Sequence, residues 1–350
     1  MKDNNSTNKN KILWSLLFVL IAVLTVCTIT SQSKDFSFSG FLEFLSTLDP
    51  IYTILAFVAM LMFIIFEGLA ILTILRSFGY KRGFFKGFSY SAADIYFSAI
   101  TPSATGGQPA SALLMMRDGI PGPVVTVALL TNLVMYTFAI LIIGLVSFIL
   151  RPAMFLEFSL LSQILIIIGV VCQIVIALVF ILLLKKDRIL FKICSGTLGL
   201  LARLHIIKKL DAKVEKLDSS IREYHSYVSQ LKGKQSMLFR ALLCNIIQRA
   251  SLVCVTLFAF LASGGNHSLS VDMFVAKCMV ILGSNTVPIP GAMGVIDYLL
   301  LDAFAGFVDS ATSVNLELLA RTVSFYFCVL LCGIVFIVRL VSMQITKRKK

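Results

Sequence analysis

The sequence predicts an all-α polytopic membrane protein, and three observations support this fold class. Of its 350 residues, 58% are hydrophobic and only 14% are charged. The mean hydropathy is +0.93, which is not typical of a soluble chain. Several apolar runs have about the 20 residues that a helix needs to cross a hydrocarbon core of ~30 Å. Because these runs are continuously apolar and do not alternate with polar residues, they exclude a membrane β-barrel.

The first span is expected over residues 12–30. Three lysines and one aspartate precede it, which resembles the start of a secretory signal peptide. The apolar run is long, however, and no small-residue cleavage site follows it. We therefore expect an uncleaved first span, and one integral membrane domain over residues 1–350.

Five more runs predict full spans, and two further apolar runs are broken by Pro and Gly. The full spans are expected at residues 51–75, 122–150, 160–184, 237–262 and 317–340. The broken runs are 84–120 and 273–306. Proline removes a backbone donor and glycine permits a tight reversal, so a single straight helix cannot continue through either run.

The net charge of +13 is concentrated in particular connections between the runs. Both termini, residues 76–86 and residues 185–236 are net positive, whereas residues 31–50 and 263–317 are net negative. Cytoplasmic connections are enriched in Lys and Arg, and this rule holds throughout if each broken run enters and leaves on one side. We therefore predict two re-entrant helical hairpins, one from each side, with cytoplasmic termini. Two short crossings in each broken run would give the same sidedness.

The predicted elements repeat with opposite orientation. A span, a hairpin and a span occupy residues 51–150, and the same three elements occupy residues 237–340 in reverse orientation. Paired broken segments in two such halves are typical of inverted-repeat transporters with a substrate site near the membrane midplane.

The tips of both hairpins supply candidate substrate-binding groups. Non-helical backbone at membrane depth needs protein or a water-filled cavity to satisfy its polar groups. The polar groups of the first tip, with the positive end of the following half-helix, would suit an anionic headgroup, and an ordinary cytoplasmic turn is the alternative. The candidates at the first tip are Thr101, Ser103, Thr105, Gly106, Gly107 and Gln108. Those at the second tip are Pro290, Gly291, Gly294 and Asp297, the last of which could equally be a helix N-terminal carboxylate.

Together the two tips resemble a known family. Residues 101–110 read Thr-Pro-Ser-Ala-Thr-Gly-Gly-Gln-Pro-Ala, and residues 288–297 carry Pro-x-Pro-Gly-x-x-Gly-x-x-Asp. These motifs and the span pattern resemble the flippase-like transmembrane region of lysylphosphatidylglycerol synthases over essentially the whole chain. The second motif departs from the family's more common Pro-Gly-Gly-x-Gly-x-x-Glu, because Ala292 replaces a Gly and Asp297 the Glu. Because aspartate is shorter than glutamate, it is open whether Asp297 makes the same contact as the family's Glu.

The resemblance implies a lipid-translocating module. In the full-length synthases this module moves aminoacylated phosphatidylglycerol to the outer leaflet and protects against cationic peptides. Those synthases also carry a soluble acyltransferase domain, which we expect this chain to lack because it ends at Lys350, shortly after the last span. We therefore expect no intrinsic phosphatidylglycerol lysyltransferase activity.

Ionisable residues inside the spans are further candidates, because a charge at membrane depth costs about 3 kcal/mol on insertion scales. One helical face of span 237–262 carries Asn245, Gln248 and Arg249. A guanidinium holds phosphate through two parallel hydrogen bonds and stays charged, which suits a lipid phosphodiester. A structural pair of Glu67 with Arg249 or with Arg321 is the alternative.

Three more acidic positions and one basic position have simpler interpretations. Asp94 and Asp302 are expected at half-helix or interface positions, with proton coupling as the alternative. Arg117 and Asp118 are expected in a solvated cytoplasmic turn.

The basic connection 185–236 contains an amphipathic pattern with apolar residues at alternating spacings of three and four. The stripe consists of Ile207, Leu210, Val214, Leu217, Ile221, Tyr224, Val228 and Leu231. Basic residues on the other faces favour a helix that lies on an anionic inner leaflet or packs against the bundle, and a coiled-coil dimer is the alternative.

We therefore predict a multi-pass protein of the bacterial cytoplasmic membrane that binds or translocates an anionic or aminoacylated phospholipid, or a related lipid-linked substrate. The alternatives are the membrane component of an aminoacyl-lipid system with a separate synthase partner, and a non-transporting scaffold. No nucleophile with an adjacent base and no metal-ligand spacing stands out, so no catalytic residue, metal, cofactor or nucleic-acid partner is predicted. The sequence leaves open which lipid is moved, the direction and energy source, and the oligomeric state.

Overall fold

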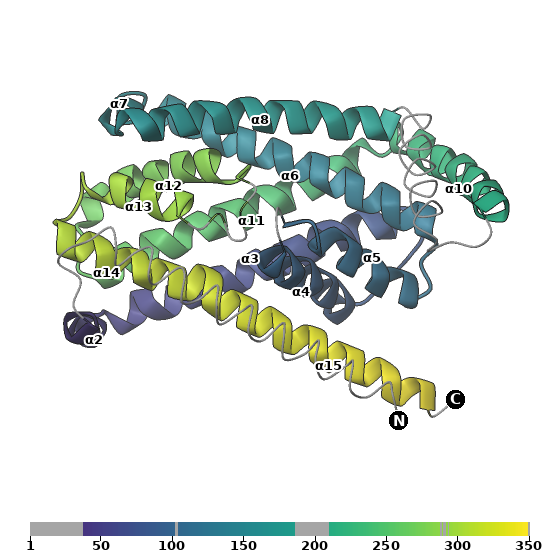
Figure 1. The fold of residues 1–350 in the computed structure, drawn as a ribbon, viewed down its shortest axis with the longest axis horizontal. Coiled ribbons are helices and arrows are strands. Elements are labelled where there is room, and N and C mark those ends of the chain that lie inside the picture. The colour runs from purple at the N-terminus through teal and green to yellow at the C-terminus, as the bar shows by residue number, and fades with distance from the viewer. Residues whose placement is uncertain are drawn as a thin grey trace.

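The computed structural model describes residues 38–101, 104–185, 210–287, 289, 292 and 294–348, and every regular element in these ranges is helical (Figure 1). The long helices are α3 (Pro50–Ser77), α6 (Gly122–Leu150), α8 (Leu160–Lys185) and α11 (Gln235–Ala262). A continuous helix comprises α14 (Ser310–Arg321), a π-helical turn (Thr322–Phe327) and α15 (Cys328–Arg348). The shorter helices are α2 (Phe38–Thr47), α4 (Phe84–Ile100), α5 (Gly107–Arg117), α7 (Met154–Glu157), α10 (Leu210–Leu231), α12 (Ser270–Ser284) and α13 (Val295–Phe304).

The predicted all-α membrane fold is confirmed. Six described helical stretches are long and apolar enough to cross a membrane. They are Pro50–Ser77, Gly122–Leu150, Leu160–Lys185, Gln235–Ala262, His267–Ser284 and Ser310–Met343. Five of them coincide with or contain predicted full spans, whereas His267–Ser284 covers the first arm of the second predicted hairpin. The span predicted at residues 12–30 lies outside the described residues.

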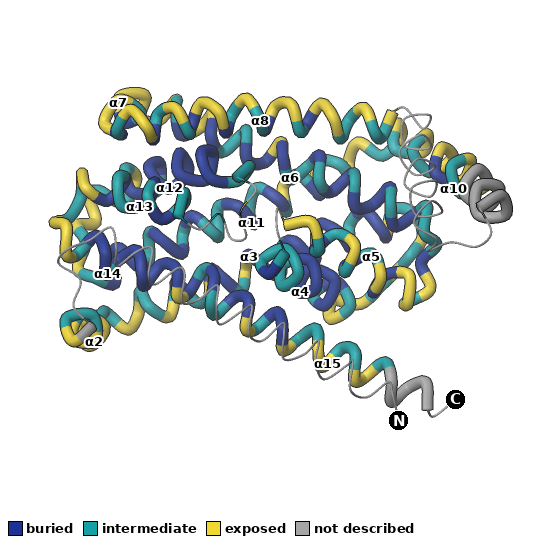
Figure 2. The backbone as a smooth tube through the Cα atoms, in the orientation of Figure 1, coloured by how far each residue is buried: buried dark blue, intermediate teal, exposed yellow. Residues whose placement is uncertain are grey.

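The outer helices expose apolar side chains and bury polar ones, which is the arrangement expected where hydrocarbon replaces water as the surroundings. Helix α8 is an example, and Figure 2 shows that its outer face is largely exposed. That face consists of Leu160, Ile164, Ile167, Val171, Ile174 and Leu178. The opposite face of α8 buries Ser162 and Gln173 against the bundle.

Glycines let the short helices approach the long ones closely, as small residues do in membrane bundles. A Cβ on Gly68 of α3 would lie 2.8 Å from the carbonyl carbon of Gly87 on α4. A Cβ on Gly169 of α8 would lie 1.9 Å from the carbonyl oxygen of Leu282 on α12. These contacts fix α4 and α12 against the bundle at backbone distance.

The two pairs of short helices lie toward opposite ends of the bundle (Figure 1). Helices α4 and α5 lie toward the end with α10, and α12 and α13 toward the end with α2 and α7. Each pair returns to the end at which it starts. At the first, Arg82 before α4 donates a hydrogen bond of 2.9 Å to the carbonyl of Asp118 after α5.

At the second pair, both ends lie beside the segment that contains α7. Arg151 forms an ion pair with Asp272 at the start of α12. The Ser159 hydroxyl donates to the Asp302 carboxylate of α13 at 3.0 Å. The tip between α12 and α13 reaches half-way along α6, because the Tyr136 hydroxyl donates to the Asn285 side-chain oxygen at 2.7 Å. The placement of both pairs in a membrane as re-entrant hairpins, and the inverted repeat, stay predictions.

The described part of the basic connection forms α10, as its apolar stripe predicts. The Tyr224 hydroxyl donates to the carbonyl of Leu183 at the end of α8, at 2.9 Å. The Tyr227 ring packs edge-on against Phe78, with 5.6 Å between centroids. Helix α10 therefore packs against the end of the bundle, which is one of the two predicted arrangements. Residues 186–209 lie outside the described ranges.

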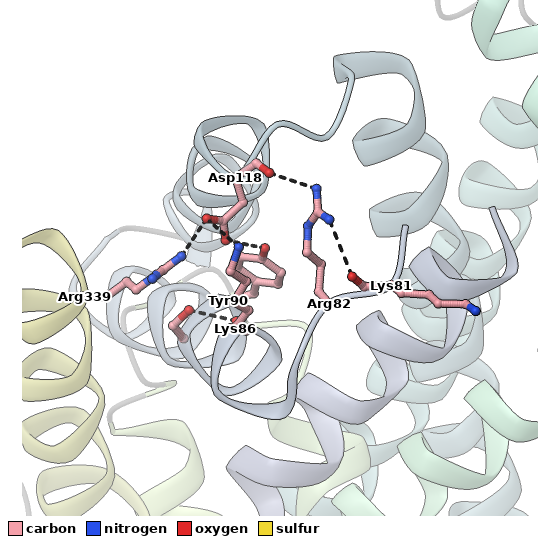
Figure 3. Close-up of polar contacts among 7 residues, drawn as sticks. Lys81, Arg82, Lys86, Tyr90, Asp118 and Arg339 are labelled. Carbon is pink, nitrogen blue, oxygen red and sulfur yellow. Dashed lines mark hydrogen bonds and ion pairs between the residues drawn. The ribbon is translucent and has the colours of Figure 1, made fainter. Parts of the chain in front are cut away.

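The turn after α5 is held by several charged contacts (Figure 3). The Asp118 carboxylate accepts hydrogen bonds of 2.6 Å from both Tyr90 and Arg339 and lies 3.3 Å from the Lys86 ammonium. Its side chain is 7% exposed, so the prediction of a solvated turn is wrong for Asp118. Residues far apart in the chain, on α4 and α15, converge on it. Burial alone raises the pKa of Asp118, but the Tyr90 hydrogen bond and the Arg339 and Lys86 charges outweigh burial and hold this pKa below its ordinary value.

Candidate functional site

The middle of the bundle contains a buried arginine on α11 that pairs with aromatic rings. Arg249 is 6% exposed and lies half-way along its helix. Its guanidinium lies 4.8 Å from the ring centroid of Phe63 on α3 and 4.4 Å from that of Tyr136 on α6. Within the described ranges it forms no ion pair shorter than 4.0 Å, and its Nε has no hydrogen-bond partner. Cation–π contacts stabilise the charge but leave the N–H donors free for an acceptor.

Beside Arg249 lie two buried carboxyl groups, which we call the carboxyl pair: Glu67 of α3 and Asp94 of α4. Glu67 is 8% exposed and Asp94 is 5% exposed. Their side chains lie within hydrogen-bonding reach of each other, and Glu67 also interacts electrostatically with Arg249. Asp94 lies on the short helix α4, and its carboxyl group is buried beside Glu67.

Neutral donors surround the carboxyl pair. The Gln248 amide donates to Glu67 Oε2 at 3.0 Å. The Gln108 amide donates to Asp94 Oδ2 at 2.6 Å, and the Ser98 hydroxyl donates to Asp94 Oδ1 at 3.1 Å. The first tip, α3 and α11 therefore meet at the carboxyl pair.

The first tip is shaped for this contact. A Cβ on Gly107 would lie 2.0 Å from Ser98 Oγ and 2.1 Å from Asp94 Oδ1, so only glycine fits there. The Thr101 hydroxyl accepts from the Gly106 N–H at 2.9 Å and donates to the Phe97 carbonyl at 2.6 Å, which closes the turn.

The predicted candidates of the first tip therefore separate by position. Gly107 and Gln108 adjoin the carboxyl pair, and Thr101 and Gly106 hold the turn together. Thr105 is exposed, and Ser103 lies outside the described residues.

The third member of the predicted polar face, Asn245, lies one turn before Arg249. Its amide nitrogen donates to Asn132 Oδ1 on α6 at 3.1 Å and to the Ala241 carbonyl at 2.9 Å. Asn245 therefore links α11 to α6, while Gln248 and Arg249 lie at the carboxyl pair.

A second charged cluster lies between α12, α13 and α14. Arg321 forms an ion pair of 2.5 Å with the fully buried Asp297, and its Nε lies 3.6 Å from Glu317. The Asp297 carboxylate also accepts from the Gly294 N–H at 2.8 Å, and Gly294 has φ +80°, a conformation that favours glycine. Lys277 of α12 is buried and interacts electrostatically with these groups.

Sequence reasoning missed Lys277 and Glu317. Lys277 is the only charged residue in the apolar run 273–284, which is itself a signal of function or pairing inside a membrane. Glu317 precedes Arg321 by four residues, the spacing of an ion pair on one helix face.

The structure thus places the predicted candidates in two clusters. Glu67, Gln108, Gln248 and Arg249 lie in the first, whereas Asp297 and Arg321 lie in the second. Among the described residues of the second tip, Asn285 accepts a hydrogen bond from the hydroxyl of Tyr136, whose ring lies against Arg249. Pro290 and Gly291 lie outside the described residues.

The first cluster has the chemistry of an anion site. Arg249 offers a fixed positive charge and unpaired donors, and the Gln248 side-chain oxygen also has no hydrogen-bond partner. A phosphodiester would satisfy the guanidinium bidentately. Among the described residues, no three His, Cys, Asp or Glu side chains are grouped to hold a metal ion.

Comparison with protein families gives one match. The family model described as "Lysylphosphatidylglycerol synthase TM region" matches residues 12–332. This range contains both pairs of short helices and both charged clusters. A search of curated proteins finds no match.

Proposed function

The chain belongs to the lysylphosphatidylglycerol synthase transmembrane-region family, and from this membership we propose that it translocates an anionic or aminoacylated phospholipid, or a related lipid-linked substrate, across the bacterial cytoplasmic membrane. The family connects the chain with membrane lipid, and the six apolar stretches make it a multi-pass membrane protein. The residues in the bundle centre support the proposal that this lipid is translocated.

The observation that carries the proposal is the environment of Arg249. An arginine at membrane depth is costly, and a structural arginine offsets that cost with a carboxylate, as Arg321 does with Asp297. Arg249 instead stacks on Phe63 and Tyr136, and its Nε is unpaired. A lipid phosphate would supply the missing acceptor, so Arg249 can bind an anionic headgroup.

The path for the lipid follows from the opposed pairs of short helices. Helices α4–α5 would open toward the cytoplasm, the side on which the positive-inside rule predicts both termini, and α12–α13 toward the outside. The acyl chains would stay in the bilayer, along the apolar outer faces, while the headgroup passes Arg249. Rocking of one half of the bundle against the other would expose Arg249 to each leaflet in turn.

The test is lipid translocation by purified protein in liposomes. We expect Arg249→Ala to reduce the rate for a labelled anionic phospholipid about tenfold to a hundredfold, because hydrogen bonds to charged groups contribute about 1.5–3 kcal/mol. Arg249→Lys keeps the charge but loses the two parallel hydrogen bonds, so an intermediate rate is expected.

The control is Arg240→Ala, an exposed arginine on the same helix, which should leave the rate unchanged. Size-exclusion profiles establish that each variant folds. Equal rates for Arg249→Ala and the wild type would refute the assignment.

The two alternatives differ from translocation in the lipids of a deletion strain. A component of an aminoacyl-lipid system would remove a lipid species, and a scaffold would change no lipid. Translocation predicts an altered outer leaflet at constant total composition.

A further inference from the structure

We propose that the carboxyl pair, Glu67 and Asp94, is a proton-binding site that takes up one proton for each anionic lipid bound at Arg249. This inference rests on the proposed function and adds to it the energy source, a proton gradient.

The two carboxyl groups lie within hydrogen-bonding reach of each other. An ionised carboxylate only accepts hydrogen bonds, so two carboxyl groups within hydrogen-bonding reach require a proton between them. The other donors at the pair are the neutral groups of Gln108, Gln248 and Ser98. Neither carboxyl group forms an ion pair shorter than 4.0 Å with a described residue. The pair therefore holds one proton and one negative charge.

Among the described residues, the charged or titratable groups that face the pair come from α11 and α15. Helix α11 contributes Arg249, and α15 contributes the Cys332 thiol. Helix α5 contributes only the Gln108 amide, and α6 approaches through Tyr136, whose ring lies against Arg249. Arg249 is thus the cation that balances the single negative charge of the pair.

Lipid binding changes the net charge at the site. The guanidinium cannot give up its proton, so one positive charge stays at the site throughout. Without lipid it balances the singly protonated pair. A lipid phosphodiester brings a second negative charge into a low-dielectric region, where an uncompensated charge is costly. Uptake of a second proton by the pair restores neutrality, so lipid and proton bind together.

An independent observation indicates that a ligand belongs here. Arg249 is more than nine-tenths buried with its Nε unpaired, and Gln248 is 1% exposed with its side-chain oxygen unpaired. Unpaired polar atoms at this depth are costly unless a ligand satisfies them in part of the cycle. The same two residues contact or face Glu67, which places the ligand next to the proton.

Linked binding is reciprocal, and this reciprocity gives the direction in which lipid affinity changes with pH. If lipid binding takes up a proton, protonation must strengthen lipid binding. The dissociation constant should then rise about tenfold per pH unit over the range in which the pair takes up its second proton. A proton gradient would drive lipid from the acidic side to the alkaline side.

The experiment measures binding of a short-chain phosphatidylglycerol to detergent-purified protein by calorimetry, in buffers of different ionisation enthalpy and at several pH values. We expect one proton taken up per lipid bound. Glu67→Gln/Asp94→Asn imitates the fully protonated pair, and we expect it to bind lipid with no proton uptake and no pH dependence. Glu157→Gln, an exposed carboxyl on α7, is the control and should behave as the wild type.

Lipid binding without proton uptake by the wild type would overturn the proton site and leave the proposed function standing. Uptake that persists in the double variant would also overturn it. If the wild type neither binds nor moves the lipid, the proposed function fails. The shared proton is then tested by infrared spectroscopy, in which a protonated carboxyl band should be present in the wild type and absent from the double variant. Absence of that band from the wild type would overturn the inference.

Discussion

Two arginines inside the apolar helices have opposite surroundings. Arg321 lies between Asp297 and Glu317, and removal of either partner would leave a buried charge uncompensated. Arg249 lies between Phe63 and Tyr136. Spacing along the chain reveals only Glu317, four residues before Arg321, because Asp297, Phe63 and Tyr136 come from other helices. The free donors of Arg249 therefore become visible only when the helices are packed.

At the residue scale, Gly107 gives a prediction about how the site is held. A Cβ there would lie 2.1 Å from Asp94 Oδ1 and 2.5 Å from the Asp94 carbonyl oxygen. Gly107→Ala should push α5 away from α4 and destabilise the protein by about 1–3 kcal/mol, as overpacking does. Thermal unfolding in detergent measures the loss, and translocation should fall with it.

Gly122→Ala is the matched control. Its Cβ would meet nothing closer than the Met116 sulfur at 3.8 Å, so unfolding should be unchanged. A Gly107→Ala protein as stable and active as the wild type would contradict the described contact between the first tip and Asp94.

At the element scale, the pair α4–α5 is held by its two ends. At the tip, Gln108 contacts the carboxyl pair. At the base, the Asp118 carboxylate contacts the side chains of Tyr90, Lys86 and Arg339. Because Arg339 lies on α15, the base couples the pair to the C-terminal helix (Figure 3). Movement of α4–α5 therefore requires the contacts of Asp118 to change.

Asp118→Asn tests this coupling. Loss of the charge should cost roughly 1–3 kcal/mol and increase amide hydrogen exchange in α4 and α5 more than elsewhere. The pKa of Asp118 is below its ordinary value. The ionised carboxylate therefore stabilises the folded protein above the unfolded-state pKa, and this stabilisation is lost as the pH falls through the folded-state pKa. The difference between variant and wild type should therefore shrink on acidification.

Glu223→Gln, an exposed carboxyl on α10, should show neither effect. A difference between Asp118→Asn and the wild type that grows on acidification would contradict the direction of the Asp118 shift.

At the scale of the whole molecule, opposite ends of the bundle carry different connections. Helix α10 lies at one end, and the turn after α11 lies at the other, because α11 separates them along its full length. The positive-inside rule assigns the end with α10 to the cytoplasm. If this predicted orientation holds, it determines which leaflet each pair of short helices faces.

Cysteine labelling tests the orientation. In a protein without its native cysteines, Ser268→Cys should react with an impermeant maleimide on intact cells, whereas Ser226→Cys on α10 should react only after permeabilisation. Both serines are exposed, so access and not burial decides the result. The reverse pattern would invert the predicted topology and the sides from which the two pairs of short helices open.

The sequence by itself determined the all-α membrane fold, the approximate positions of the long described helices, the two Pro- and Gly-broken regions and the amphipathic α10. These depend on the length and periodicity of apolar runs, which are local properties of the chain. The tertiary structure decided which polar side chains meet. Glu67 meets Asp94, and Arg321 meets Asp297. Lys277 interacts electrostatically with both Arg321 and Asp297. Such contacts depend on the rotation and depth at which separate helices pack, and no local pattern specifies those.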